Sequence, residues 1–307
     1  MKPLTNILVA TDFSNACNAA IDIAIELCKQ HGATMHLIHV NESNHILAAP
    51  ELPEIVSEII NDIDHDARAR LYEMYESILR EDEITVQIHL PAGIPFEEIC
   101  VSASEMPIDL IIAGTHGTAG ESSMAIGTTA YNIIKYATKP VLLIPASFKK
   151  GAFKNILFPI RPSQNLSAKY ELVESIWGDT SSHVHIGVFA LPREGDKTAS
   201  NNAQLQEVMA LMQNSNLACT SEFYTSKNLA EKVIEVSSLL CMDLVVISST
   251  LDYKYAQFCM SAYTRRVINN SKVPVLSLRN TINNIDEQQD EELMEQKQTQ
   301  FAAPYYK

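Results

Sequence analysis

One stretch of the chain is most informative about its fold: Gly114-Thr115-His116-Gly117-Thr118-Ala119-Gly120-Glu121-Ser122-Ser123-Met124-Ala125-Ile126-Gly127-Thr128-Thr129. The apolar run 110–113 before it is typical of a buried strand, and the apolar spacing in 130–137 is typical of a helix. Glycines let a backbone approach a phosphate closely, and the N–H groups at a helix start bind anions. The stretch therefore predicts a strand, an anion-binding loop and a helix in succession.

Strands and helices alternate around this stretch. Short apolar strands are expected at 7–10, 35–40, 86–90, 110–114 and 141–144, and helical periods lie between them, the longest at 54–80. Ser14 stands where it can cap the first helix, and Gly32 stands just beyond the end of that helix. This alternation predicts an α/β fold with a doubly wound parallel five-stranded sheet.

The pattern then begins a second time. The segment 6–10 resembles 155–159, which lies 149 positions later, and 139–142 resembles 273–276, which lies 134 positions later. Two tandem Rossmann-like sheets of five strands explain this similarity. We expect domains at 1–148 and 149–280, a linker at 145–151, and an acidic, mobile tail at 281–307. Their last strands, 141–144 and 275–278, are expected to pair with each other, because unpaired apolar edges favour pairing.

Composition excludes several functional classes. The net charge of −14 argues against nucleic acid as a partner, and the acidic excess lies mainly in residues 1–148. No apolar run is long enough to span a membrane, which predicts a cytoplasmic protein without a membrane partner. The six cysteines are scattered without a C-x-x-C pair, so they are interpreted as thiols rather than a disulfide framework.

The glycine spacing G-x2-G-x9-G-T is neither a P-loop nor a G-x-G-x-x-G fingerprint. It resembles the nucleotide-binding motif of the universal stress protein family, and the resemblance covers both copies, from about Thr5 to Leu278. It implies a fold like that of the adenine nucleotide alpha hydrolases and an adenine nucleotide as ligand. An aspartate after the first strand and main-chain groups near the end of the second would hold the adenine end. The implied site residues are Asp12, Val40, Gly114, Thr115, Gly117, Gly127, Thr128 and Thr129.

The loop departs from an ordinary phosphate site in its charge. Residues 118–126 contain Glu121 but no Lys or Arg. Phosphates would then depend on backbone N–H groups, on the hydroxyls of Ser122, Ser123, Thr128 and Thr129, and on a divalent cation such as Mg²⁺. The lack of positive charge argues against tight binding of a triphosphate, so ADP and AMP stay open beside ATP.

The second copy has lost the motif. Gly114, Gly117 and Gly127 correspond to Ser248, Leu251 and Ser261, and Asp12 corresponds to Arg161. Side chains would stand where a phosphate needs bare backbone. One nucleotide per chain is therefore expected, in the first copy. Arg265 and Arg266 are interpreted as a solvated helix face.

We expect a stress-response sensor or regulatory module with at most slow hydrolysis and no assigned catalytic residue. The two copies would form an internal pseudo-dimer, with a homodimer and an unknown protein partner both open. His183 and His185 alternate on a strand and face the same side, but packing is favoured over a metal site. Two other functions remain: a nucleotide-free scaffold for protein contacts, and an adenylating enzyme of the same architecture.

Overall fold

The computed structural model describes residues 3–42, 54–116, 126–149, 153–160, 173–177, 182–190, 218–249, 251–252 and 259–279, with the single residues 192 and 206. The first half contains β1 (Asn6–Ala10), α1 (Asn15–His31), β2 (Thr34–Ile38), α2 (Glu54–Asp82), β3 (Val86–His89), α3 (Pro95–Glu105), β4 (Leu110–Gly114), α4 (Thr128–Tyr136) and β5 (Val141–Ile144). The second half contains β6 (Asn155–Ile160), β7 (His183–Ala190), β8 (Ala218–Thr225), α7 (Leu229–Leu239), β9 (Leu244–Ser249), β10 (Leu251–Asp252), β11 (Cys259–Met260), α8 (Ala262–Asn270) and β12 (Val275–Arg279).

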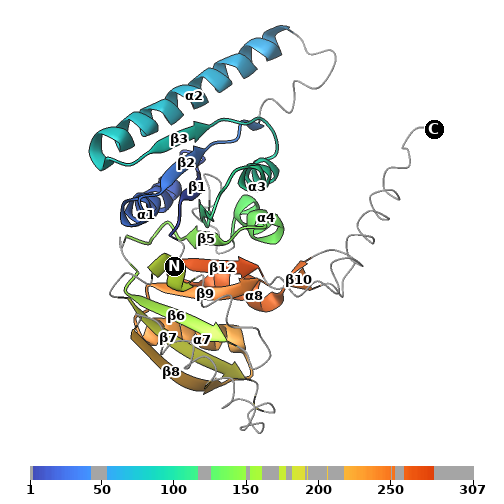
Figure 1. Cartoon of the computed structure of the whole chain (residues 1–307). Coiled ribbons are helices and arrows are strands. Elements are labelled where there is room, and N and C mark those ends of the chain that lie inside the picture. Colours follow the sequence, from blue (N-terminus) through green and yellow to red (C-terminus); the bar gives the residue numbers. More distant parts are fainter. Residues whose placement is uncertain are drawn as a thin grey trace, which may run out of the picture.

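A single ten-stranded sheet runs through both halves, in the order β3-β2-β1-β4-β5-β12-β9-β6-β7-β8 (Figure 1). Each half contributes five parallel strands, and the second half repeats the strand order of the first. The halves meet at the antiparallel pair β5–β12, where Leu142 lies opposite Leu276. The predicted pairing of the last strands is confirmed, and the two expected sheets are the halves of one continuous sheet.

Strand registers repeat with the spacings found in the sequence. Asn6 lies opposite Thr34 between β1 and β2, and Asn155 lies opposite His183 between β6 and β7, 149 positions later in each strand. Between β4 and β5 the pair is Ile111 with Val141, and between β9 and β12 it is Val245 with Val275. The last pair is shifted by 134 positions, so the two halves follow one folding pattern.

A carboxylate at the start of β4 is also repeated at the start of β9. Oδ2 of Asp109 accepts hydrogen bonds from the backbone N–H groups of Thr5 and Asn6, at 2.7 and 3.0 Å. Oδ2 of Asp243 accepts from the N–H groups of Lys154 and Asn155, at 3.1 and 3.0 Å. Each carboxylate thus fixes the start of the neighbouring first strand of its half.

Helices cover both faces of the sheet. α1 and α2 bury apolar side chains such as Ile23 and Leu71 on one face, together with Trp177 of the second half. α3, α4, α7 and α8 bury side chains such as Ile133 and Val267 on the other face. Both cores contain residues of the two halves, so the β5–β12 seam is as tightly buried as the interior of either half.

Three local details differ from the sequence-based predictions or refine them. Ser14 does occupy the N-cap of α1, but its side chain makes no capping hydrogen bond. Gly32 ends α1 in a left-handed conformation, with φ of 66°, as predicted. β2 ends at Ile38, so Val40 lies two residues beyond the strand rather than at its end. The predictions for Gly117, for Arg161 and for the tail 281–307 lie outside the described residues.

Candidate functional site

The predicted site residues gather at one edge of the first half of the sheet. β2, β1, β4 and β5 are parallel neighbours, so their carboxyl ends meet at the same edge. Asp12 follows β1, Val40 follows β2, and Gly114 is the last residue of β4. These predicted residues are far apart in the chain, and in the structure they lie at the ends of adjacent strands.

Asp12 is held in place by its own local turn. Its Oδ1 accepts hydrogen bonds from the N–H of Ser14 at 3.0 Å and from Sγ of Cys17 at 2.9 Å. Burial and, next, the hydrogen bond to Asp12 raise the pKa of the Cys17 thiol to about 11. Cys17 therefore stays a neutral donor at physiological pH. The first turn of α1 therefore fixes the carboxylate of Asp12, at the place where a cap by the side chain of Ser14 was expected.

A stack of three side chains from different elements lies beside Asp12. Phe13 has a φ of 62°, which is rare for a residue with a side chain, and its ring lies 4.2 Å from that of His39. The Cζ atom of the Arg70 guanidinium, from α2, lies 4.5 Å from the centre of the Phe13 ring. Nδ1–H of His39 donates to the carbonyl of Thr11 at 2.8 Å, and burial lowers the pKa of His39. Arg70 thus brings a positive charge to this edge that no local pattern of the sequence indicated.

The base of the glycine loop is closed by backbone hydrogen bonds. The N–H of Thr115 donates to the carbonyl of Ile144 in β5 at 3.0 Å, and the N–H of Gly127 donates to the carbonyl of Thr115 at 2.8 Å. Thr115 is buried, and its hydroxyl lies 2.9 Å from Nδ1 of His116. Nε2 of His116 is buried without a hydrogen-bond partner among the described residues. The two ends of the loop are therefore brought together directly above β4.

α4 begins with no side-chain cap. Its N-cap is Gly127, and Thr128 and Thr129 are exposed in its first turn. Gly127 has φ of −61° and ψ of 149°, a conformation open to any residue. The backbone conformation therefore does not by itself require a glycine at this position.

The first half of the chain matches a known family. A model of the universal stress protein family matches residues 3–145, which include every residue predicted for the site. Residues 3–145 form a universal stress protein domain. The described residues among those that the resemblance selected lie at the carboxyl ends of the strands of this domain.

Two individual relatives each match 45% of the chain. Universal stress protein MJ0531 of Methanocaldococcus jannaschii is 28% identical over 140 residues, covering 45% of this chain and 80% of that protein. Universal stress protein YxiE of Bacillus subtilis is 26% identical over 143 residues, covering 45% of this chain and 96% of that protein. A universal stress protein of Archaeoglobus fulgidus has a crystal structure similar to the whole chain, with a TM-score of 0.68 and 18% identity. That likeness covers 89% of this chain and 98% of the other, so the shared fold extends into the second half.

The second half differs from the universal stress protein domain at the position of the loop. Leu251 lies in β10, which pairs with β11 in a short antiparallel ladder opposite Met260. Ser261 replaces Gly127 at the helix N-cap, and its Oγ accepts a hydrogen bond from the N–H of Thr264 at 3.2 Å. The start of α8 is thus capped by its own side chain, whereas the start of α4 is not.

Both halves carry a buried histidine at the same position, on the second strand. In the universal stress protein domain, Nε2–H of His36 donates to Oδ1 of Asn6, and Nε2–H of His89 donates to Nδ1 of His36, each at 3.0 Å. In the second half, His185 uses both ring nitrogens, toward the hydroxyls of Thr220 and Tyr224 at 2.9 Å. His185 is therefore part of a packing network.

The His36–His89 pair predicts a loss of stability in acid. Burial lowers the pKa of both rings below the ordinary value of 6.5, and the proximity of His89 lowers that of His36 further. Below about pH 6.5 these two histidines bind protons in the unfolded chain but stay neutral in the folded chain. Their contribution to the free energy of unfolding is therefore fully present above this pH and is lost as the pH falls. Urea unfolding between about pH 7.5 and about pH 5.5 should show this decline, with a shallower slope in His36→Gln. The exposed His65→Gln is the control, and an equal slope in His36→Gln and wild type would contradict the assignment.

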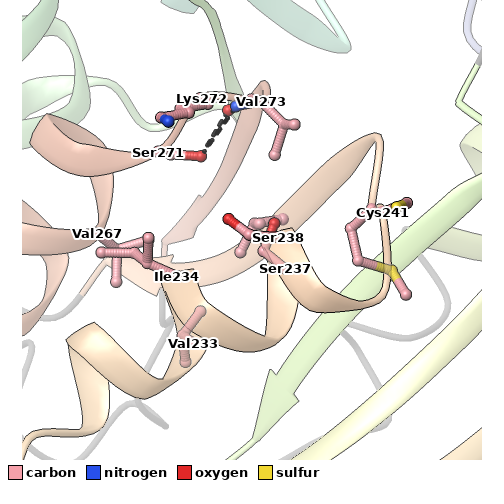
Figure 2. A pocket seen from close by; sticks show the side chains of 11 residues that line it. Val233, Ile234, Ser237, Ser238, Cys241, Val267, Ser271, Lys272 and Val273 are labelled. Carbon is pink, nitrogen blue, oxygen red and sulfur yellow. Dashed lines mark hydrogen bonds between the residues drawn. The ribbon is translucent and has the colours of Figure 1, made fainter.

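A small cavity of about 190 Å³ lies away from these residues, between α7, β9 and the segment after α8. Figure 2 shows its lining, with Ser237 and Ser238 from α7 and the hydrogen bond between Ser271 and Val273. None of the predicted site residues lines it. Among the helices of the described residues, none has the length and apolar character needed to cross a membrane.

Proposed function

We propose that the universal stress protein domain binds one adenine nucleotide and that the chain acts as a sensor or regulatory module in a stress response. The observation that carries the proposal is the contrast between the two helix starts. Gly127 leaves the N–H groups of α4 without a side-chain cap, whereas Ser261 caps α8. An uncapped helix start with glycine at the cap is a site for a phosphate group.

The residues present fit such a ligand. Thr128 and Thr129 place exposed hydroxyls at the uncapped start of α4, and Nε2 of His116, which has no partner within the described part of the chain, lies two residues beyond β4. In the proposed complex, Asp12 and the backbone near Val40 hold the adenine end, and Gly114, Thr115, Gly117 and Gly127 hold the ribose and phosphates. Mg²⁺ would neutralise the phosphates, since the loop has no Lys or Arg. ATP, ADP and AMP are all candidates.

In this proposal, residues 1–148 and 149–280 are two domains of common origin that form an internal pseudo-dimer. The repeated strand order supports the division into two domains, and the paired strands β5 and β12 with the two shared cores support the pseudo-dimer. The second domain would serve as a structural and regulatory partner, because its loop positions carry side chains and its helix start is capped. The external partner of the chain would be a protein that recognises whether the first domain holds a nucleotide.

The proposal assigns no catalytic residue, and nucleotide turnover would be at most slow. In this scheme the nucleotide orders the Gly114–Thr128 loop, and the changed surface recruits or releases the partner. Rate acceleration of phosphoryl transfer depends on positioned cations and an oriented nucleophile. Arg70 is engaged with the Phe13 ring at the adenine end and is assigned no part in hydrolysis.

Nucleotide content after purification tests the proposal first. The full chain should release an adenine nucleotide on acid extraction, or should bind one in calorimetry with Mg²⁺ present. Chromatography of the extract identifies whether ATP, ADP or AMP is carried. A protein that carries none and binds none at millimolar concentration would instead be a nucleotide-free scaffold.

A further inference from the structure

The loop of the first domain is held at one end by the second half of the chain. The backbone N–H of Ile126 donates a hydrogen bond to Oδ1 of Asn269 at 3.0 Å, across 143 positions of sequence. Ile126 directly precedes Gly127, the N-cap of α4. The same turn is tied to its own domain through the bond from Gly127 N–H to the Thr115 carbonyl. The end of the loop is therefore fixed by one bond from each half.

The seam explains how the two residues meet. The antiparallel pairing of β5 with β12 places the helices that precede these strands, α4 and α8, on the same face of the sheet. Asn269 is half-buried in the last turn of α8. Its neighbour Asn270 is exposed and donates to the carbonyl of Arg266 within the same helix, at 2.8 Å. Among the described residues, the first of these adjacent asparagines bonds to the other half and the second bonds within its own helix.

The contact has no counterpart in the opposite direction. With the spacing of 134 positions, Ile126 corresponds to Met260 and Asn269 corresponds to Lys135. An ammonium group has no acceptor, so Lys135 is unable to receive a backbone N–H. Lys135 instead lies 4.7 Å from the ring of Tyr136, and Met260 pairs with Leu251 in the β10–β11 ladder. The second half supports the loop of the first, whereas its own loop position is closed by a ladder.

We propose that Asn269 is a positioning residue for Ile126 and Gly127 and that the second half pre-orders the start of α4 for phosphate binding. This inference rests on the proposed function for its ligand. A group that fixes the loop before binding lowers the ordering cost of the complex and so raises affinity. Because coupling is reciprocal, nucleotide binding in turn strengthens the contact between the halves. The seam is then part of the site.

Three variants of the full chain test this role. Asn269→Leu keeps the size of the side chain but removes the acceptor, and Asn269→Asp keeps an acceptor oxygen at the same place. Asn270→Leu is the matched control on the same helix turn. The first readout is hydrogen exchange at the Ile126 amide by NMR in ligand-free protein, and the second is affinity for ADP with Mg²⁺ by calorimetry.

We expect exchange at Ile126 to become about tenfold faster in Asn269→Leu, as the loss of one hydrogen bond implies, and to return close to wild type in Asn269→Asp. ADP affinity should fall about two- to tenfold in Asn269→Leu and should not change in Asn270→Leu. Unchanged exchange at Ile126 in Asn269→Leu would overturn the inference, as would unchanged ADP affinity. If wild type binds no adenine nucleotide, the proposed function and the link to phosphate binding both fall, and exchange at Ile126 still decides whether Asn269 orders the loop.

Discussion

Replacement of Leu276 by Asp is expected to leave most of the chain unfolded under native conditions. Leu276 is fully buried in β12, opposite Leu142 across the seam, and belongs to the core that both halves share. Truncating such a leucine to alanine costs about 2–5 kcal/mol, and an unpaired buried carboxylate costs several more. Domains are stable by only about 5–15 kcal/mol, so this change consumes most of the margin.

Urea unfolding measures this effect with two probes. Circular dichroism reports both halves, and fluorescence of Trp177, the single tryptophan, reports the second half. Both signals should fall together, because the cores cross the seam. Leu239→Asp is the control, since Leu239 is 75% exposed at the end of α7, and its effect should stay within about 1 kcal/mol. A wild-type midpoint for Leu276→Asp, or a first half that stays folded after the Trp177 signal is lost, would show that the seam does not join the halves.

The second large effect is expected for Gly127→Val, which should abolish or strongly weaken nucleotide binding without unfolding the protein. The backbone of Gly127 has an ordinary conformation, so valine fits the chain itself. Its branched side chain would instead stand at the start of α4, where the phosphate is proposed to lie. Overpacking of this kind costs about 1–3 kcal/mol, or about 5- to 150-fold in affinity.

Thr129→Ala provides the comparison at the same helix start. It removes one exposed hydroxyl, and a neutral hydrogen bond is worth about 0.5–1.5 kcal/mol. Calorimetry with ADP and Mg²⁺ should therefore give the order wild type, Thr129→Ala, Gly127→Val in decreasing affinity, with equal thermal stability of the three proteins. Binding by Gly127→Val as tight as by wild type would place the phosphate elsewhere.

Much of the fold follows from local patterns in the sequence. The apolar runs at 110–114 and 141–144 became β4 and β5 within their predicted bounds, because a short buried strand is specified by its own residues. The repeat could also be predicted from the sequence, and the strand registers of the structure show the same spacings of 149 and 134 positions. Pairing of β5 with β12 followed from the apolar character of both edges and from their tether.

The contacts around the site were less predictable, because they join residues that are distant in sequence. Nothing near Arg70 indicates that it lies over Phe13, and nothing near Asn269 indicates that it receives the Ile126 N–H. Both contacts depend on how the helices α2 and α8 pack against the sheet, which the local sequence does not specify. Ser14 occupies the N-cap of α1 as predicted, but the N–H of Cys17, which its side chain would have bound, donates to the Ser14 carbonyl at 3.0 Å instead.

The glycine at 127 shows another limit of sequence reasoning. A glycine is compatible with either an unusual backbone or a need for space, and the sequence does not distinguish them. The structure gives φ of −61°, so an unusual backbone conformation is not the reason for this glycine. Ser261, its counterpart in the second half, carries a side chain at the same N-cap position and uses it to cap α8.

Stoichiometry of adenine nucleotide binding tests the central claim most directly. ATP, ADP and AMP are titrated with Mg²⁺ into the full chain, into Gly127→Val, and into Ser261→Gly, which removes the cap of α8. The account predicts one nucleotide per wild-type chain, binding that is about 5- to 150-fold weaker in Gly127→Val, and unchanged binding in Ser261→Gly. Two sites of similar affinity in wild type, or binding that survives in Gly127→Val and disappears in Ser261→Gly, would contradict it.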